Sequence, residues 1–124
     1  ARPDLVAKYE KVKSDDPRHT KAEFAALVEG EDQAIARVLK FLDESGLADN
    51  TLVIFTSDNG GSGGGDRNAP LRLSKGTFYE GGLRVPMIAR LPGVIRPGTV
   101  SDTMVNVVDF YPTFAEFAGA KLPE

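Results

Sequence analysis

The sequence predicts a single α/β domain in which a long helix packs on a small, mostly parallel sheet. Three observations lead to this prediction: an apolar stripe at helical spacing over residues 21–45, a continuous apolar run at Thr51–Thr56, and a second such run at Val85–Leu91. At 124 residues, the chain is long enough for one compact domain with a core and too short for two.

The helix is predicted over residues 21–45, after a polar lead-in at residues 1–20. Thr20 and Glu23 have the spacing of a capping box, and Gly46 is placed to end the helix in a left-handed conformation. Apolar side chains recur at intervals of three and four residues, and we expect the stripe that they form to pack on the sheet. The stripe consists of Phe24, Leu27, Val28, Ile35, Val38, Leu39 and Leu42.

The strands are predicted from two apolar runs. Thr51–Thr56 is apolar on both faces, which is typical of a strand that is covered on both sides in a parallel sheet, and a glycine-rich loop follows it. Val85–Leu91 begins with a Val-Pro pair, and proline is tolerated at the start of a strand. Val100–Val108 is expected to be extended, and Asp109 is placed to cap a short final helix that ends at Ala118.

The composition excludes several classes of function. Acidic residues outnumber basic residues by 18 to 15, so the net charge is −3, and a general nucleic-acid binder, which needs a basic surface, is not expected. The chain has no cysteine and one histidine, which excludes disulfide scaffolds, thiolate metal sites and multi-histidine zinc centres. No apolar run approaches the roughly 20 residues that span a bilayer.

Two segments carry candidate binding chemistry. Asp58 and Asn59 follow the first predicted strand, where ligands bind in open α/β sheets, and their oxygens suit Ca²⁺ or Mg²⁺. Asp-Asn-Gly is also a common turn, and two ligands are fewer than the about six to eight oxygens that Ca²⁺ takes, so both interpretations stay open. Lys75 lies in a glycine-rich stretch within residues 66–96, which contain six basic and two acidic residues. An anion site and a solvated basic surface both fit this excess.

Four ordered motifs together resemble the sulfatase family. They are TLVIFTSDNGG at residues 51–61, KGTFYEGGLRVP at 75–86, LPGVI at 91–95 and VVDFYPTF at 107–114. The resemblance extends from about Phe24 to Gly119. It implies an alkaline-phosphatase-like α/β sandwich, of which this chain is expected to be an internal segment, with residues 21–124 as part of the catalytic domain.

The resemblance implies roles for three residues. Asp58 and Asn59 resemble two ligands of the divalent cation in the active site of the family, which is usually Ca²⁺. Lys75 resembles the lysine that contacts the substrate sulfate and stabilises charge at the leaving oxygen. The chain departs from the family pattern directly before this lysine, where it has Leu-Ser and the family often has two glycines. For Arg84, a structural ion pair with Glu80 is the expected role.

The implied activity is hydrolysis of a sulfate ester, on a small molecule or a carbohydrate, with a divalent cation and a formylglycine nucleophile. Formylglycine is made from Cys or Ser in a Cys/Ser-x-Pro-x-Arg motif, which this sequence lacks. We therefore expect an inactive fragment, with the nucleophile and the other metal ligands in the N-terminal half of a periplasmic or secreted sulfatase. The alternatives are a related phosphatase or phosphonate monoester hydrolase, and a non-catalytic module of the same fold that binds an anion or a partner.

Overall fold

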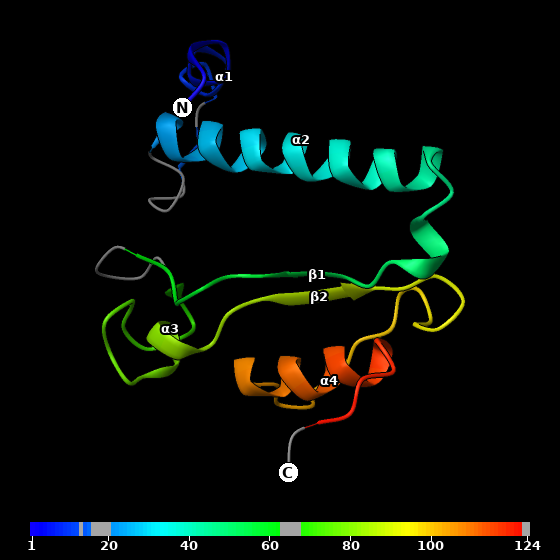
Figure 1. The fold of residues 1–124 in the computed structure, drawn as a ribbon. Coiled ribbons are helices and arrows are strands. Elements are labelled where there is room, and N and C mark those ends of the chain that lie inside the picture. Colours follow the sequence, from blue (N-terminus) through cyan, green and yellow to red (C-terminus); the bar gives the residue numbers. More distant parts are fainter. Residues whose placement is uncertain (13, 16–20, 63–67, 123–124) are drawn as a thin grey trace.

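The computed structural model describes residues 1–12, 14–15, 21–62 and 68–122. α2 lies on one side of the two strands and α4 lies on the other (Figure 1). None of the helices in the described part of the chain is long and apolar enough to cross a membrane. The elements follow in the order α1 (Pro3–Tyr9), α2 (Ala22–Glu44), η2 (Ala48–Asn50), β1 (Val53–Thr56), α3 (Glu80–Leu83), β2 (Met87–Arg90), η4 (Val107–Asp109) and α4 (Phe110–Phe117).

The long helix α2 begins and ends within one residue of its predicted bounds. Its N-cap is Lys21, and Thr20 of the predicted capping box lies outside the described residues. The predicted C-terminal stop is confirmed, because Gly46 has a φ of 67° and the Leu47 N–H donates to the carbonyl oxygen of Leu42 at 2.9 Å. Local pattern was therefore sufficient to locate this helix.

The sheet differs from the prediction. β1 and β2 pair antiparallel, with Val53 opposite Arg90 and Thr56 opposite Met87, so the expectation of a mostly parallel sheet is wrong for this pair. Among its described residues, the connection between the strands contains only the four-residue α3 and no crossover helix of the kind that parallel neighbours need. A continuous apolar run shows that a strand is covered on both faces, but it does not determine the direction of the neighbouring strand.

Most of the apolar stripe of α2 is exposed in this chain. Phe24 is 64% exposed, Leu27 56% and Val38 58%, and large apolar side chains of β2 and α4 are exposed as well. The expectation that the whole stripe packs on the sheet is therefore wrong for this chain; α2 meets β2 through an ion pair between Asp43 and Arg90 (2.7 Å). Spacing shows which face of a helix is apolar, whereas burial depends on which segments are present to cover that face.

The first helix, α1, was not predicted from the sequence. Its proline in the first turn and the acidic residue beside it, Asp4, are the signals that could have located it within the predicted polar lead-in. Leu5 of α1 and Ala26 of α2 are buried, and a Cβ at Gly30 of α2 would lie in ordinary contact with Leu5 Cδ1, at 3.8 Å. α1 therefore packs on α2 through a small apolar contact, one of the few buried regions in the described part of the chain.

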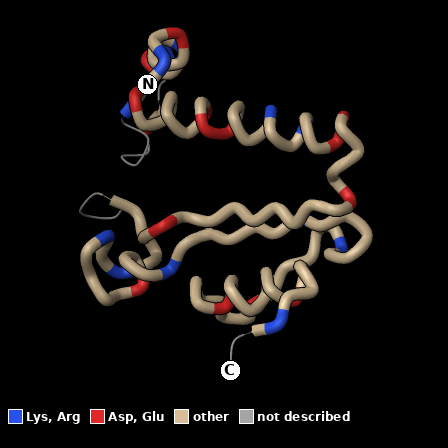
Figure 2. The backbone as a smooth tube through the Cα atoms, in the orientation of Figure 1, with Lys and Arg blue, Asp and Glu red and all other residues tan. Residues whose placement is uncertain are grey.

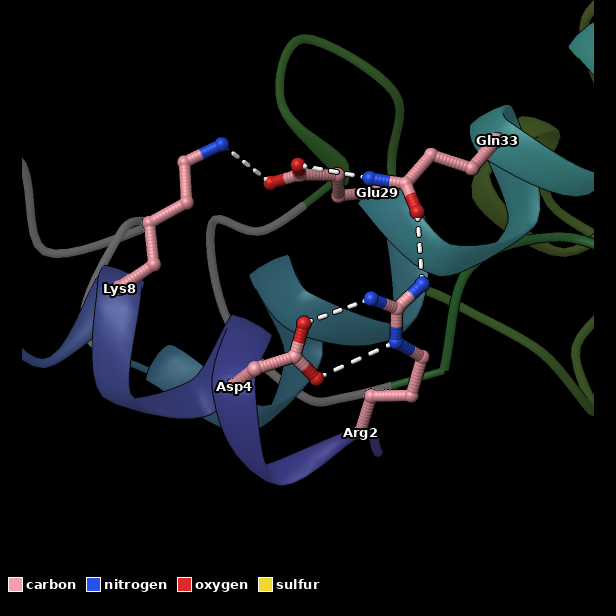
Figure 3. Close-up of polar contacts among 5 residues, drawn as sticks. All are labelled: Arg2, Asp4, Lys8, Glu29 and Gln33. Carbon is pink, nitrogen blue, oxygen red and sulfur yellow. Dashed lines mark hydrogen bonds and ion pairs between the residues drawn. The ribbon is translucent and has the colours of Figure 1, made fainter.

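Polar contacts hold α1 on α2 (Figure 3). The Arg2 guanidinium donates to the Asp4 carboxylate at 2.6 Å and to the Gln33 amide oxygen at 2.8 Å. Lys8 pairs with Glu29 at 2.6 Å, and the Gln33 amide nitrogen donates to the same Glu29 carboxylate at 3.0 Å. Glu29 thus accepts hydrogen bonds from both helices.

Acidification is expected to loosen α1 from α2. Hydrogen bonding from Lys8, and next from Tyr9, holds the pKa of Glu29 below its ordinary value of 4.5. Because the folded pKa is the lower one, the contact is stabilised above pH 4.5, and this stabilisation is lost as the pH falls through the folded pKa. Amide hydrogen exchange of α1, followed to acidic pH, should show protection falling in that window. Glu29→Gln should reduce this pH dependence and Glu31→Gln, on the same helix, should not; protection that is unchanged by acid would contradict the prediction.

The last helix, α4, begins where it was predicted, but its cap differs. Asp109 is the N-cap residue by position, yet its side chain makes no capping bond to α4. Its carboxylate instead accepts a hydrogen bond from the Asn106 N–H at 2.7 Å, in a capping box that closes η4. The predicted extended stretch Val100–Val108 therefore ends in a 3₁₀ turn, because Asn106 and Asp109 have the spacing that such a box requires.

Candidate functional site

The predicted site residues lie at one end of the sheet, where the chain leaves β1 (Figure 1). Three segments meet there, which are residues 57–62 after β1, residues 68–79, called the lysine segment below, and α3. Basic positions gather in the loop around α3 (Figure 2). Asp66 and Arg67 of the predicted basic stretch lie outside the described residues.

Two backbone hydrogen bonds join the segment after β1 to the other two segments. The Lys75 N–H donates to the carbonyl oxygen of Gly61 at 3.0 Å. The Gly60 N–H donates to the carbonyl oxygen of Gly82, in α3, also at 3.0 Å. The main chain of the predicted sulfate-binding lysine therefore lies beside the segment that carries the two predicted cation ligands.

The close approach of these segments requires glycine. Gly60, Gly81 and Gly82 are buried, and a Cβ at each of them would overlap a carbonyl oxygen of a neighbouring segment. The oxygen belongs to Gly81 for the first, Leu73 for the second and Thr77 for the third. The Gly-Gly pair of the KGTFYEGG motif thus serves the packing of α3 against the other two segments.

Asp58 and Asn59 lie in a turn directly after β1. The Ser57 hydroxyl donates to the Asn59 carbonyl oxygen at 2.8 Å and closes this turn. Asp58 is exposed and Asn59 is half-buried, with its amide nitrogen 3.4 Å from the carbonyl oxygen of Gly60. This contact turns the Asn59 nitrogen toward the backbone and leaves its amide oxygen as the atom available to a cation.

The oxygen atoms of Asp58 and Asn59 suit a hard divalent cation, but they are few. Carboxylate and amide oxygens are the ligands that Ca²⁺ and Mg²⁺ prefer, and Asp58 and Asn59 supply one of each. Within the described residues, no group of three or more Asp, Glu, His or Cys side chains could hold a metal ion. These two residues therefore account for a minority of the about six to eight oxygens that Ca²⁺ takes.

Lys75 lies at a tight turn, and its side chain is exposed, so its ammonium group is accessible to an anion. The Thr77 hydroxyl donates to the Ser74 carbonyl oxygen at 2.8 Å, across the lysine. Gly76 has a φ of 86°, which glycine adopts without strain. The turn thus holds the main chain on both sides of Lys75.

Arginine side chains of the same region have structural partners. Arg84 pairs with Glu80 at 3.3 Å, which confirms the expected ion pair, and both side chains are exposed. The Arg72 guanidinium lies over the ring of Tyr79, 4.1 Å from its centroid. Lys75 therefore differs from these two cations in having no such contact to hold its charged group among the described residues.

Sequence reasoning missed Asn68. Its side-chain amide donates to carbonyl oxygens of all three segments of the site. Such contacts produce no periodicity and no motif, because every residue offers a carbonyl oxygen. The Asn-Ala-Pro-Leu-Arg stretch that follows the glycine-rich loop was the one local signal of an ordered turn at this place.

Comparison with known proteins identifies the family. Residues 1–120 match the sulfatase family. A sulfatase from Formosa agariphila is 57% identical over an alignment that covers 97% of this chain and 23% of that protein. The steryl-sulfatase of Rattus norvegicus is 44% identical, with 77% of this chain and 18% of that protein covered. The chain belongs to the sulfatase family, as its motifs predicted.

A solved structure supports the same conclusion. The crystal structure of Ps i-CgsB in complex with k-i-k-neocarrahexaose is similar to 99% of this chain, with a TM-score of 0.83 and 36% sequence identity. The similarity covers 27% of that protein, and the chain spans about a quarter or less of the length of the relatives named here. The predicted α/β fold, as a segment of the alkaline-phosphatase-like sandwich, is confirmed at this level.

Proposed function

We propose that this chain is part of the catalytic domain of a sulfatase that hydrolyses sulfate esters, in which Asp58 and Asn59 bind the divalent cation and Lys75 binds the sulfate. The observation that carries the proposal is the 3.0 Å hydrogen bond from the Lys75 N–H to the carbonyl oxygen of Gly61. This bond sets the lysine beside the end of β1, where Asp58 lies. A cation and an ammonium group on one edge of a sheet suit an oxyanion with several negatively charged oxygens.

The cation contributes charge, and this chain contributes two of its ligands. When bound, Ca²⁺ or Mg²⁺ offsets negative charge on the sulfate oxygens and orients the ester. The amide oxygen of Asn59 and the carboxylate of Asp58 hold the ion at the strand end. We propose that other segments of a longer protein supply the remaining ligands and a formylglycine nucleophile, because the relatives are several times longer than this chain.

Lys75 contributes a second positive charge and up to three hydrogen-bond donors. As the bond between sulfur and the leaving oxygen breaks, negative charge accumulates on that oxygen. An ammonium group in a fixed place stabilises this charge more in the transition state than in the bound substrate. The turn at Gly76 and the bond to Gly61 are the features that keep the main chain of the lysine in place.

A sulfated carbohydrate is the substrate class that we propose. The similar solved structure is a complex with k-i-k-neocarrahexaose, a hexaose by its name. In this chain, the exposed Arg72 lies three residues before Lys75 and adds positive charge beside the proposed sulfate site. A saccharide with more than one sulfate group would profit from this distribution of charge.

The test compares sulfate and phosphate esters of the same phenol on a protein that carries this sequence within a complete catalytic domain. We expect a higher kcat/KM for the sulfate ester, loss of turnover on treatment with a chelator, and recovery on addition of Ca²⁺. A preference for the phosphate ester would identify a phosphatase. Absence of turnover of both esters, with an intact nucleophile motif, would identify a non-catalytic member of the family.

A further inference from the structure

The side chain of Asn68 contacts each of the three segments that build the site. Its amide nitrogen lies 3.2 Å from the carbonyl oxygen of Gly61, after β1, and 3.0 Å from that of Leu73, two residues before Lys75. It also lies 3.2 Å from the carbonyl oxygen of Gly81 in α3. One half-buried side chain therefore links all three segments, in addition to the backbone hydrogen bonds between them.

The three carbonyl oxygens around the Asn68 amide nitrogen determine the orientation of this amide. Its two protons can serve three acceptors when one of them is shared between two carbonyl oxygens. A rotation of the amide group by half a turn would place its oxygen against three carbonyl oxygens, which repel it. Asn68 thus acts as a donor toward all three segments, and a carboxylate of the same shape is unable to replace it.

Gly61 connects Asn68 to Lys75. The carbonyl oxygen of Gly61 accepts both the Lys75 N–H at 3.0 Å and the Asn68 amide at 3.2 Å. The Asn68 side chain also packs against the α-carbon of Gly61, since a Cβ at that position would overlap the Asn68 amide oxygen and lie 3.0 Å from its Cγ. Asn68 and Lys75 therefore share one anchor, on the segment that carries Asp58.

We propose that Asn68 is the positioning residue for Lys75. It holds the carbonyl oxygens of Gly61 and Leu73 at a set separation, and so fixes the main chain that presents the lysine ammonium group to the sulfate. The inference rests on the proposed function of Lys75, and Asn68 itself is assigned no contact with the substrate. Displacement of a catalytic group by about 1 Å can lower a rate on the order of 100-fold, so a positioning residue has a measurable effect.

Hydrogen exchange tests the structural step without any assay of activity. In the full-length protein that carries this sequence, Asn68→Ala is expected to increase amide exchange in residues 72–82 and to leave α2 unchanged. Asn68→Asp keeps the shape of the side chain without the donor and should behave in the same way. Asn50→Ala, in η2 at the opposite end of β1, is the matched control. Unchanged exchange in residues 72–82 of both Asn68 variants would overturn the proposal.

Kinetics tests the positioning step. Asn68→Ala should lower kcat by about 10- to 100-fold with a smaller change in KM. In a protein that already carries Lys75→Ala, the same change should have little further effect, because the group that Asn68 positions is gone. Additive losses would show that Asn68 only supports the fold and would overturn the proposal. Wild-type turnover in Lys75→Ala would instead show that the proposed role of Lys75 is wrong. The proposed positioning role of Asn68 would then be wrong as well.

Discussion

Replacing Lys75 with alanine is expected to lower kcat of the full-length protein by about 100-fold or more. The reason is that the ammonium group stabilises charge that develops on the leaving oxygen, so its loss acts on the transition state. The side chain is exposed, and we expect the free energy of unfolding to change by less than about 0.5 kcal/mol. Steady-state kinetics and thermal unfolding on the same preparation separate the two effects.

Arg84→Ala is the matched control for this prediction. Arg84 is another exposed cation of the loop around α3, and its partner is Glu80 in an exposed ion pair, so its loss removes the same charge without touching the lysine turn. We expect kcat to stay near the wild-type value. Equal losses in both variants, weakened by added salt, would show that a diffuse basic surface attracts the substrate. Unchanged kcat/KM in Lys75→Ala would remove this residue from the site.

Asp58→Ala is expected to weaken cation binding by at least about tenfold and to lower turnover when the cation is scarce. The carboxylate supplies both a ligand oxygen and a negative charge, and Asn59 supplies only a neutral oxygen. Turnover should therefore recover in part as the Ca²⁺ concentration is raised. The measurement is the Ca²⁺ concentration that gives half-maximal turnover after removal of bound metal by a chelator.

The control for this variant is Asp49→Ala. Asp49 is an exposed carboxylate in η2, at the opposite end of β1 from Asp58. Its replacement changes the net charge equally and should leave the dependence on Ca²⁺ as it is in the wild type. An unaltered half-maximal Ca²⁺ concentration in Asp58→Ala would contradict the assignment of Asp58 as a ligand.

Residues that follow one another along the chain were the predictable part of the site. Asp58 and Asn59 come directly after β1, so locating the strand also located them at its end. Lys75 was recognised through its motif, and its place beside Gly61 depends on a backbone bond between distant segments. Asn68 had no such signal, because its partners are carbonyl oxygens that any residue offers.

The sequence by itself determined the helix at Ala22–Glu44, its stop at Gly46, both strands and the start of α4. These features depend on spacing, caps and turns, which act over a few neighbouring residues. Motif order was also sufficient to identify the sulfatase family.

The tertiary structure alone decided the antiparallel pairing of β1 and β2, the packing of α1 on α2, and the junction of three segments through Asn68. It also decided that the apolar stripe of α2 is exposed in this chain. The physical reason is the same in each case. Strand direction, burial and side-chain contacts with a distant backbone depend on the path of the chain through space, and local residue patterns are compatible with more than one path.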